Sequence, residues 1–247
     1  MAILNKGTKE KILQSPLGFL YKWYLNMRLH HERKFAGKST KEIMTAIYAQ
    51  KLWSGSEEFY SGEGSHQPSI TQPYVTKLNE FFYSFPEKLI VCDFGCGDFE
   101  VGKQLVDATK QYFAFDIVDA LIERNKKMYQ KVNLQFETID LVTDNLPDAD
   151  VAIVRQVLQH LSNKDIGIIT EKLYKYKYLL ITENIPEKEF LANIDKYAGP
   201  YTRVLTKNSG VVLTEVPFNL KPLVSEELLR INDFDGSLIV TNLYTMY

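Results

Sequence analysis

The chain has 247 residues, a length that suits one α/β domain with an additional N-terminal segment. Its hydrophobic content of 45% is enough for a sizeable core, and no apolar run approaches the roughly 20 residues that cross a membrane. The net charge of −2 is unevenly distributed: residues 1–51 hold ten Lys or Arg against three acids, and residues 52–247 hold nineteen against twenty-eight. Because nucleic acids are bound by positive charge, the acidic main part argues against a nucleic-acid partner.

The N-terminal segment is basic and has helical periodicity. Residues 8–35 carry apolar and aromatic side chains at helix-compatible spacing, and the capping box that begins at Ser39 predicts a helix to about Leu52. We expect a solvated helical lid, with contact to a membrane surface or a partner protein as the alternative. His30 and His31 are expected to have no chemical role. Charges interrupt the start of the chain, which lacks the apolar region of a signal peptide, so a cytoplasmic protein is expected.

A stretch rich in Gly and Ser follows, over residues 54–69. Its core contains Ser61, Gly64 and Ser65, whose small side chains would let the backbone wrap closely over a ligand. A plain flexible linker is the alternative reading. Residues 70–84 then predict a helix that packs on the sheet. We expect a basic extension over 1–69 and the main domain over 70–247.

The segment after residue 88 is the most informative part of the chain. The apolar run 89–92 is followed by Asp93 and a turn that contains Gly95 and Gly97, and a helix-compatible segment comes next. This order of buried strand, tight turn and helix is how open α/β sheets place backbone N–H groups beside a nucleotide-like ligand. Glycine permits close backbone approach and positive φ. Two glycines alone are a weak signal, so the downstream strands matter.

Acids recur at the ends of the next strands. Apolar runs cover residues 111–115, 134–139 and 151–154; Asp116 follows the first and Asp140 the second. The carboxyl ends of parallel strands form the ligand crevice of such a sheet, and an acid at the second tip can accept both hydroxyls of a ribose. Each acid taken alone is equally well explained as a cap. Together with Asp93 and the glycine turn, they predict a nucleoside site.

The C-terminal third completes the predicted sheet. A fifth strand over 178–182 ends at Glu183, and the polar residues 187–209 are expected near the substrate. Two late strands are predicted over 210–215 and 237–244, with no long helical pattern between them. This spacing favours an antiparallel final pair of strands.

These motifs resemble the class I S-adenosylmethionine (SAM)-dependent methyltransferases. A dehydrogenase would need a third glycine for a pyrophosphate, and the turn 95–100 has none at that spacing. The resemblance implies a Rossmann-like α/β sheet of seven strands with an antiparallel last strand, and SAM as cofactor. It implies that the methionine portion lies beside Asp93 and the two glycines, the ribose at Asp116 and the adenine at Asp140. The other cofactor-binding residues expected are Ile117, Leu141, Arg155, Gln156, Ser61, Gly64 and Ser65.

A narrower likeness begins at about residue 47. The chain is similar to a bacterial subgroup of these enzymes that is found among surface-polysaccharide genes. The shared blocks are Trp53 followed by S-G-x-G-S at 61–65, C-G-D-F at 96–99, R-x-x-L-x-H-L at 155–161 and P-F-x-L at 217–220. This chain has Gln156 where the subgroup has Asp.

Methyl transfer to a hydroxyl needs a base or a metal to remove the proton. His160, one turn past the fourth strand, is the predicted base, and a packing role is its alternative. Glu183 is expected to orient His160 or to accept the substrate hydroxyl, and a solvated position at the rim is its alternative. His66 and Arg203 are weaker candidates. Cys92 and Cys96 are the only two cysteines, read as buried thiols of a reducing compartment, and no compact metal-ligand cluster is visible.

The resemblance therefore implies a metal-independent O-methyltransferase acting on a sugar hydroxyl of a surface glycan or its precursor. N-methylation of a small metabolite or a protein side chain is the first alternative, because nitrogen needs no base. A non-catalytic SAM-binding partner of a glycosyltransferase, docked through the basic N-terminus, is the second. The expected ligands are a small acceptor and SAM, and the oligomeric state stays open.

Overall fold

The computed structural model describes residues 34–35, 37–53, 59–233 and 236–247. The predictions for residues 8–33, including His30 and His31, therefore lie outside the described residues, as does the part of the Gly- and Ser-rich stretch at 54–58.

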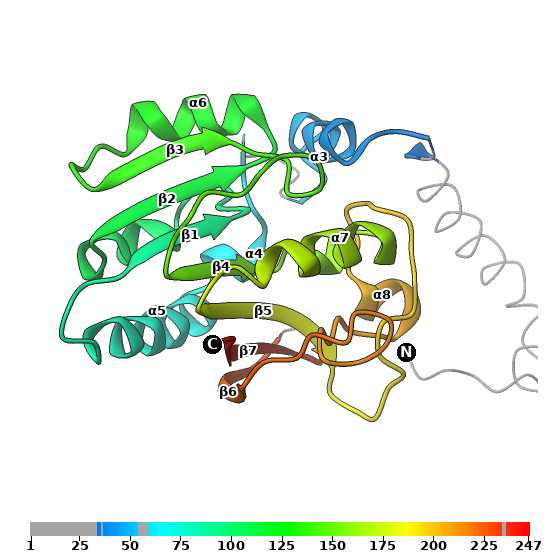
Figure 1. Ribbon diagram of the computed structural model, residues 1–247. Helices are drawn as coiled ribbons and strands as arrows, with labels where there is room; N and C mark the ends of the chain where they lie inside the picture. The colour runs from blue at the N-terminus through cyan, green and yellow to red at the C-terminus, as the bar shows by residue number, and fades with distance from the viewer. Residues whose placement is uncertain (1–33, 36, 54–58, 234–235) are drawn as a thin grey trace, which may run out of the picture.

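One sheet of seven strands forms the body of the molecule, in the order β3-β2-β1-β4-β5-β7-β6 (Figure 1). Strands β1 to β5 run parallel to one another, whereas β7 is antiparallel to both β5 and β6. This arrangement confirms the predicted Rossmann-like sheet with an antiparallel end. The strands are β1 Ile90–Phe94, β2 Gln111–Asp116, β3 Leu134–Thr138, β4 Val151–Arg155, β5 Tyr178–Pro186, β6 Val224–Asn232 and β7 Ser237–Thr245.

The described helices are mostly short. They are α3 Thr40–Ala49, α4 Glu63–His66, α5 Pro68–Tyr83, α6 Asp119–Met128, α7 Asn163–Leu173 and α8 Arg203–Lys207, with 3-10 turns at Gly102–Gln104, Val106–Ala108 and Leu158–His160. The predicted capping box starts α3: Ser39 accepts from the Glu42 amide, and the Glu42 carboxylate accepts from the Ser39 amide. Helix α5 starts two residues before its prediction.

Each face of the sheet has its own hydrophobic layer, because successive strand residues point to opposite faces. Cys92 and Phe94 of β1 pack in one cluster with α3 and α7. Val91 packs in the other cluster with α5 and the first two 3-10 turns. In Figure 1 the arrowheads of the parallel strands point toward α3 and α8, so the carboxyl edge of the sheet lies between these helices.

Three sequence expectations about the elements are wrong. Residues 210–215 form no strand, and Val211 and Leu213 are buried in the core. The strand that pairs with β7 is the largely exposed β6, whose apolar residues do not alternate regularly along it. The glycine turn leads into two 3-10 turns instead of a helix. Strand β5 continues to Pro186, because all nine of its residues pair with β7.

The proposed boundary between residues 69 and 70 falls inside α5, and α3 shares a core with the sheet. The described part of the predicted extension is thus packed against the main domain. No described helix is long and apolar enough to cross a membrane.

Candidate active site

A cavity of about 550 Å³ lies at the carboxyl edge of the sheet, within the range of small-ligand pockets. Its wall is built by the glycine turn, the ends of β2 and β4, the strap over residues 61–66, helix α3 and residues 200–205. Every predicted cofactor residue lines it: Asp93, Gly95, Gly97, Asp116, Ile117, Asp140, Leu141, Arg155, Gln156, Ser61, Gly64 and Ser65.

The glycine turn is held by backbone bonds and by close packing. The amides of Gly95 and Cys96 both donate to the carbonyl of Phe115 at 2.8 Å, which fixes the turn beside the end of β2. Gly95 and Gly97 have φ of +81° and +57°, and a β-carbon would lie 2.3 Å from Val157 Cγ2 at the first and 2.4 Å from Ser61 Oγ at the second. Glycine is therefore required at both positions by the protein's own packing, before any ligand is considered.

Asp116 closes β2 with its carboxylate in the cavity wall. Its Oδ2 accepts from the amide of Gly97 and its Oδ1 from the amide of Val118, each at 3.1 Å. Burial raises the pKa of this carboxyl to about 6. Each oxygen retains a lone pair for a further donor, as binding of a diol requires.

The wall beyond Asp116 is apolar and ends in a second acid. Ile117, Ile139 and Leu141 line this end of the cavity. Asp140 follows β3, and its Oδ1 accepts from the amide of Val142 at 2.8 Å. An apolar wall with one acid beside it can hold a purine ring.

Asp93 lies on the opposite side of the glycine turn. It is only 6% exposed, and its Oδ2 accepts from the Tyr112 hydroxyl at 2.8 Å. Burial raises the pKa of the Asp93 carboxyl to about 7. The Asp93 carboxyl is therefore poorly solvated, and a cationic ligand group beside it would stabilise its charged form.

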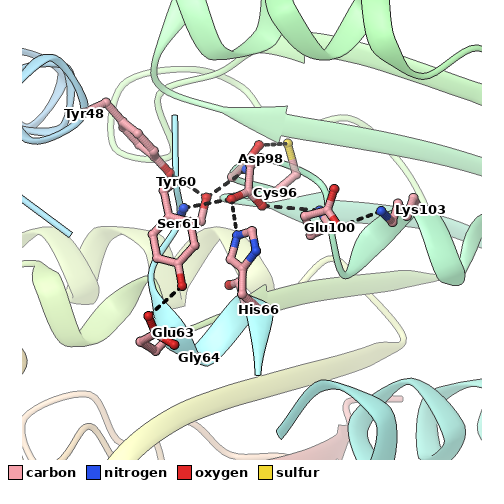
Figure 2. A network of polar contacts seen from close by, with 12 residues as sticks. Tyr48, Tyr60, Ser61, Glu63, Gly64, His66, Cys96, Asp98, Glu100 and Lys103 are labelled. Atoms are coloured by element: carbon pink, nitrogen blue, oxygen red, sulfur yellow. Dashed lines mark hydrogen bonds and ion pairs between the residues drawn. The ribbon is translucent and has the colours of Figure 1, made fainter. Parts of the chain in front are cut away.

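The strap over residues 61–66 is fastened to the glycine turn through Asp98, as Figure 2 shows. Asp98 Oδ2 accepts from the Ser61 amide at 2.8 Å and contacts His66 Nε2 at 2.7 Å. The Ser61 hydroxyl in turn accepts from the Asp98 amide and contacts the hydroxyl of Tyr48 on α3. The predicted loop therefore contains one helical turn, α4, and closes the cavity; His66 faces Asp98 and does not line the cavity.

Arg155 and Gln156 fasten the other side of the strap. Arg155 donates to the carbonyl of Gly64 and to Ser65 Oγ, the latter at 3.2 Å, and its guanidinium lies 5.0 Å from the centre of the Tyr74 ring. Gln156 has φ of +55°, and a β-carbon on Gly64 would lie 2.4 Å from its Oε1. The end of β4 and the strap are thus in direct contact.

His160 lines the cavity, but its ring nitrogens are both engaged. Nδ1 lies 3.1 Å from the carbonyl of Gly199, which can only accept, so Nδ1 carries the proton. The Gln159 side chain accepts from the Asn184 amide through Oε1, which turns its amino group to His160 Nε2 at 3.3 Å. Burial, followed by the charge of Lys196, lowers the pKa of His160 to about 3. The role of His160 as a base stays a prediction, and its low pKa and two engaged nitrogens count against that role.

The expected position of Glu183, at the end of the fifth strand, is wrong. It lies inside β5, is 3% exposed, and is absent from the cavity wall. Its two oxygens accept from the amides of Leu158 and Gln159, both at 2.9 Å, and burial raises its pKa to about 8. The acid therefore holds the turn that carries His160 through the backbone, and no described contact joins the two side chains. Arg203 is likewise fully buried, donating to carbonyls of Ile194 and Leu161.

The cavity wall also includes side chains to which the sequence gave no role: Tyr48, Tyr74, Gln159, Asn184, Tyr201 and Asp233. Trp53 packs 5.2 Å from the His160 ring and donates from Nε1 to the carbonyl of Pro200 at 3.0 Å. Part of the polar segment 187–209 thus reaches the cavity, as expected. The S-G-x-G-S block after Trp53 pointed to this region, whereas no spacing signal linked Asp233 to the site.

Neither cysteine is paired, and burial raises the pKa of the Cys92 thiol to about 12. Cys92 is buried as expected, whereas Cys96 is partly exposed. Among the residues that the structure describes, no group of three or more His, Cys, Asp and Glu side chains is placed to hold a metal ion.

Residues 92–175, from β1 to the end of α7, match the family model described as a methyltransferase domain. The match covers 84 of the 247 residues, about a third of the chain. The seven-stranded sheet has the order of a Rossmann-like methyltransferase fold.

Solved structures share this fold. The N-methyltransferase NodS from Bradyrhizobium japonicum WM9, in complex with S-adenosyl-L-homocysteine (SAH), superposes with a TM-score of 0.62 at 11% identity, over 83% of this chain and 100% of that chain. Magnesium protoporphyrin IX methyltransferase (ChlM) from Synechocystis PCC 6803, with bound SAM, gives a TM-score of 0.53 at 16% identity, over 85% and 99%. At these identities the likeness concerns the fold. No curated protein matches the sequence.

Proposed function

We propose that this protein is a methyltransferase that uses SAM to methylate a small acceptor bound at the Trp53 end of the cavity. The observation that carries the proposal is the placement of Asp116: a buried carboxylate at the tip of β2, joined to the glycine turn and facing the cavity. A dehydrogenase would require a phosphate site at a helix N-terminus, whereas this turn leads into 3-10 turns.

The residues present fit the cofactor. Asp116 would accept the two ribose hydroxyls, and Ile117, Leu141 and Asp140 would enclose the adenine. The amino-acid portion would lie between the glycine turn and the strap. When bound, SAM supplies a methyl group on a positively charged sulfur. The acidic wall formed by Asp93 and Asp116 complements that charge.

The acceptor is proposed to be a sugar of a surface glycan or its precursor, as the subgroup resemblance implies. Trp53 and Tyr201 offer aromatic surfaces of the kind that pack against a sugar ring, and Asn184 offers a polar contact. Asn184 is 2% exposed, and among the described residues no donor reaches its Oδ1. A hydroxyl or amino group of the acceptor would satisfy that atom. The unpaired thiols support a reducing, cytoplasmic setting.

The state of His160 favours a second candidate, methylation of a nitrogen. A base with a pKa of about 3 removes a hydroxyl proton inefficiently, because general-base catalysis is best with a pKa near the working pH. A neutral amine attacks without a base. The chain's residues then need only to align the nitrogen, the methyl carbon and the sulfur.

Binding and transfer experiments test the proposal in sequence. Calorimetric titration with SAM, SAH and NAD should show binding of the first two only; NAD binding without SAH binding would refute it. Incubation with SAM carrying a labelled methyl group, and with nucleotide-linked sugars or small amines, should then release SAH only where an acceptor is used. An amine acceptor predicts a rate that rises with pH through the amine's own pKa.

A further inference from the structure

Asn184 holds a buried amide oxygen that the described part of the chain leaves without a donor. It lies in β5, is 2% exposed, and its side chain lines the cavity. Its Nδ2 donates to Asp233 Oδ2 at 3.1 Å and to Ser237 Oγ at 2.6 Å, so both amino hydrogens are used. Because a carboxylate only accepts, the Asp233 contact fixes which end of the amide is the carbonyl. Oδ1 is thus an acceptor whose burial costs free energy until a donor meets it.

Asp233 brings a negative charge to the same place. It follows β6, and its amide donates to the carbonyl of Ser237 at 2.8 Å, which closes the connection between β6 and β7. Asp233 lines the cavity as Asn184 does. The Asn184 carbonyl and the Asp233 carboxylate, joined by the Asn184 amino group, are therefore one neutral and one charged acceptor in the same part of the wall.

The sheet order separates this pair from the nucleoside end of the cavity. Strands β1 and β4 lie between β2, which carries Asp116, and β5, which carries Asn184. Three strand spacings of about 4.8 Å put these two strands roughly 14 Å apart. Asn184 is instead connected to His160 through Gln159, whose Oε1 accepts from the Asn184 amide at 3.0 Å and whose amino group contacts His160 Nε2 at 3.3 Å. The pair therefore belongs to the acceptor end of the cavity.

The charge of the wall indicates what kind of donor fits there. Six acidic residues line the cavity: Glu63, Asp93, Asp98, Asp116, Asp140 and Asp233. Among the described residues of the wall, Arg155 is the single Lys or Arg, and the low pKa of His160 leaves its ring neutral. This excess of negative charge attracts a cationic group and repels an anionic one.

Resting on the proposed function, we propose that Asn184 and Asp233 bind a protonated amino group of the acceptor and select acceptors that carry one. An ammonium group has three donors and a positive charge, so it can satisfy the Asn184 carbonyl and the Asp233 carboxylate together. A hydroxyl group has one donor and no charge. Because a protonated nitrogen has no lone pair for a methyl group, the bound ammonium is an anchor. The atom that is methylated is then a second group of the same acceptor.

Matched pairs of small probes test this inference on the full chain loaded with SAH. The pairs are 1,4-diaminobutane with 1,4-butanediol, and glucosamine with glucose, which differ in amino against hydroxyl groups. Dissociation constants are measured by ligand-observed NMR for wild type, Asp233→Asn and Asn184→Leu. Asp148→Asn is the matched control, since the Asp148 side chain is 97% exposed and absent from the cavity wall.

We expect each amine to bind wild type at least about tenfold more tightly than its hydroxyl counterpart, as loss of a charge-assisted contact implies. Asp233→Asn and Asn184→Leu should weaken the amines by a similar factor and the hydroxyl probes less than about threefold. Asp148→Asn should change neither. SAH affinity should stay within about twofold of wild type in all three variants, because the pair lies apart from the nucleoside end.

Several outcomes would overturn the inference. They are amines that do not bind wild type, amines that bind no more tightly than the hydroxyl probes, and amine binding that both variants retain. Loss of SAH affinity in a folded Asp233→Asn protein would also overturn it, since the pair would then belong to the cofactor site. If a variant does not fold, the comparison of amine with hydroxyl in wild type still decides. Failure of wild type to bind SAH at all would instead refute the proposed function.

Discussion

The carboxylate of Asp116 gives the sharpest test of the proposed cofactor site. It accepts from two backbone amides at 3.1 Å, those of Gly97 and Val118, and keeps one lone pair on each oxygen for a ribose hydroxyl. Asp116→Asn removes the charge and turns an amino group toward a hydroxyl or a backbone amide. Hydrogen bonds to charged groups contribute about 1.5–3 kcal/mol each. Loss of one such bond predicts SAH binding that is roughly 10- to 150-fold weaker.

Calorimetric titration with SAH measures this loss, and Asp119→Asn is the matched control. Asp119 is an exposed acid at the start of α6, paired with Lys41 at 2.8 Å, and its substitution should leave the affinity unchanged. Thermal unfolding of the Asp116→Asn variant is measured alongside. If the new side-chain amino group faces the backbone N–H of Gly97 or Val118, that N–H loses its acceptor, which should cost about 1–3 kcal/mol of stability even without ligand. A folded Asp116→Asn protein that binds SAH as tightly as wild type would remove Asp116 from the ribose site.

Three further predictions concern neighbouring residues. Gly97→Val should abolish SAH binding with the sheet retained by circular dichroism, because its side chain occupies the position of Ser61 Oγ; normal binding would mean that the strap can move aside. The pKa of Glu183 is raised from 4.5 to about 8, so the folded chain keeps a proton that the unfolded chain releases, and stability falls as pH rises toward 8. In the Glu183→Gln variant the melting temperature should fall less steeply as the pH rises. It is measured above about pH 6.5, because below that pH the protonation of His160 in the unfolded chain has the opposite effect on stability. An unchanged slope would contradict the raised pKa of Glu183. The His160→Gln variant should have a lower kcat, and its pH–rate profile should lose no step near pH 6.5. A drop in kcat of about 10²–10⁴, together with loss of such a step, would instead support His160 as the base.

The sequence was sufficient for the parts of the site that the strands themselves position. Asp93, Asp116 and Asp140 follow apolar runs, and parallel strands bring their carboxyl ends to one edge, so local pattern and topology place all three acids in the cavity wall. The glycine turn could equally be predicted from the sequence, because two glycines after a buried strand indicate positive φ and close packing.

The sequence was insufficient where long-range pairing decides the structure. Glu183 follows five apolar or β-forming residues, yet pairing with β7 extends the strand past it and turns its carboxylate to the amides of Leu158 and Gln159. Strand β6 has an exposed, charged sequence, and only its pairing with β7 makes it a strand. The lowered pKa of His160 arises from burial, to which the distant Trp53 ring contributes, and from the charge of Lys196.

The charges around the cavity bear on the choice between a nitrogen and a hydroxyl acceptor. An acidic wall stabilises a positive charge, and transfer to an amine would leave that charge inside the cavity, on the acceptor nitrogen, where the same wall would still stabilise it. Transfer to a hydroxyl requires a proton to leave during the reaction. His160 donates from Nδ1 to the Gly199 carbonyl, and its Nε2 contacts the Gln159 amino group. If His160 took the proton, the Gln159 contact would have to break and a buried imidazolium would have to form. The proposed transfer to a hydroxyl would therefore need either release of the Gln159 contact or another group to take the proton, whereas transfer to a nitrogen would need neither.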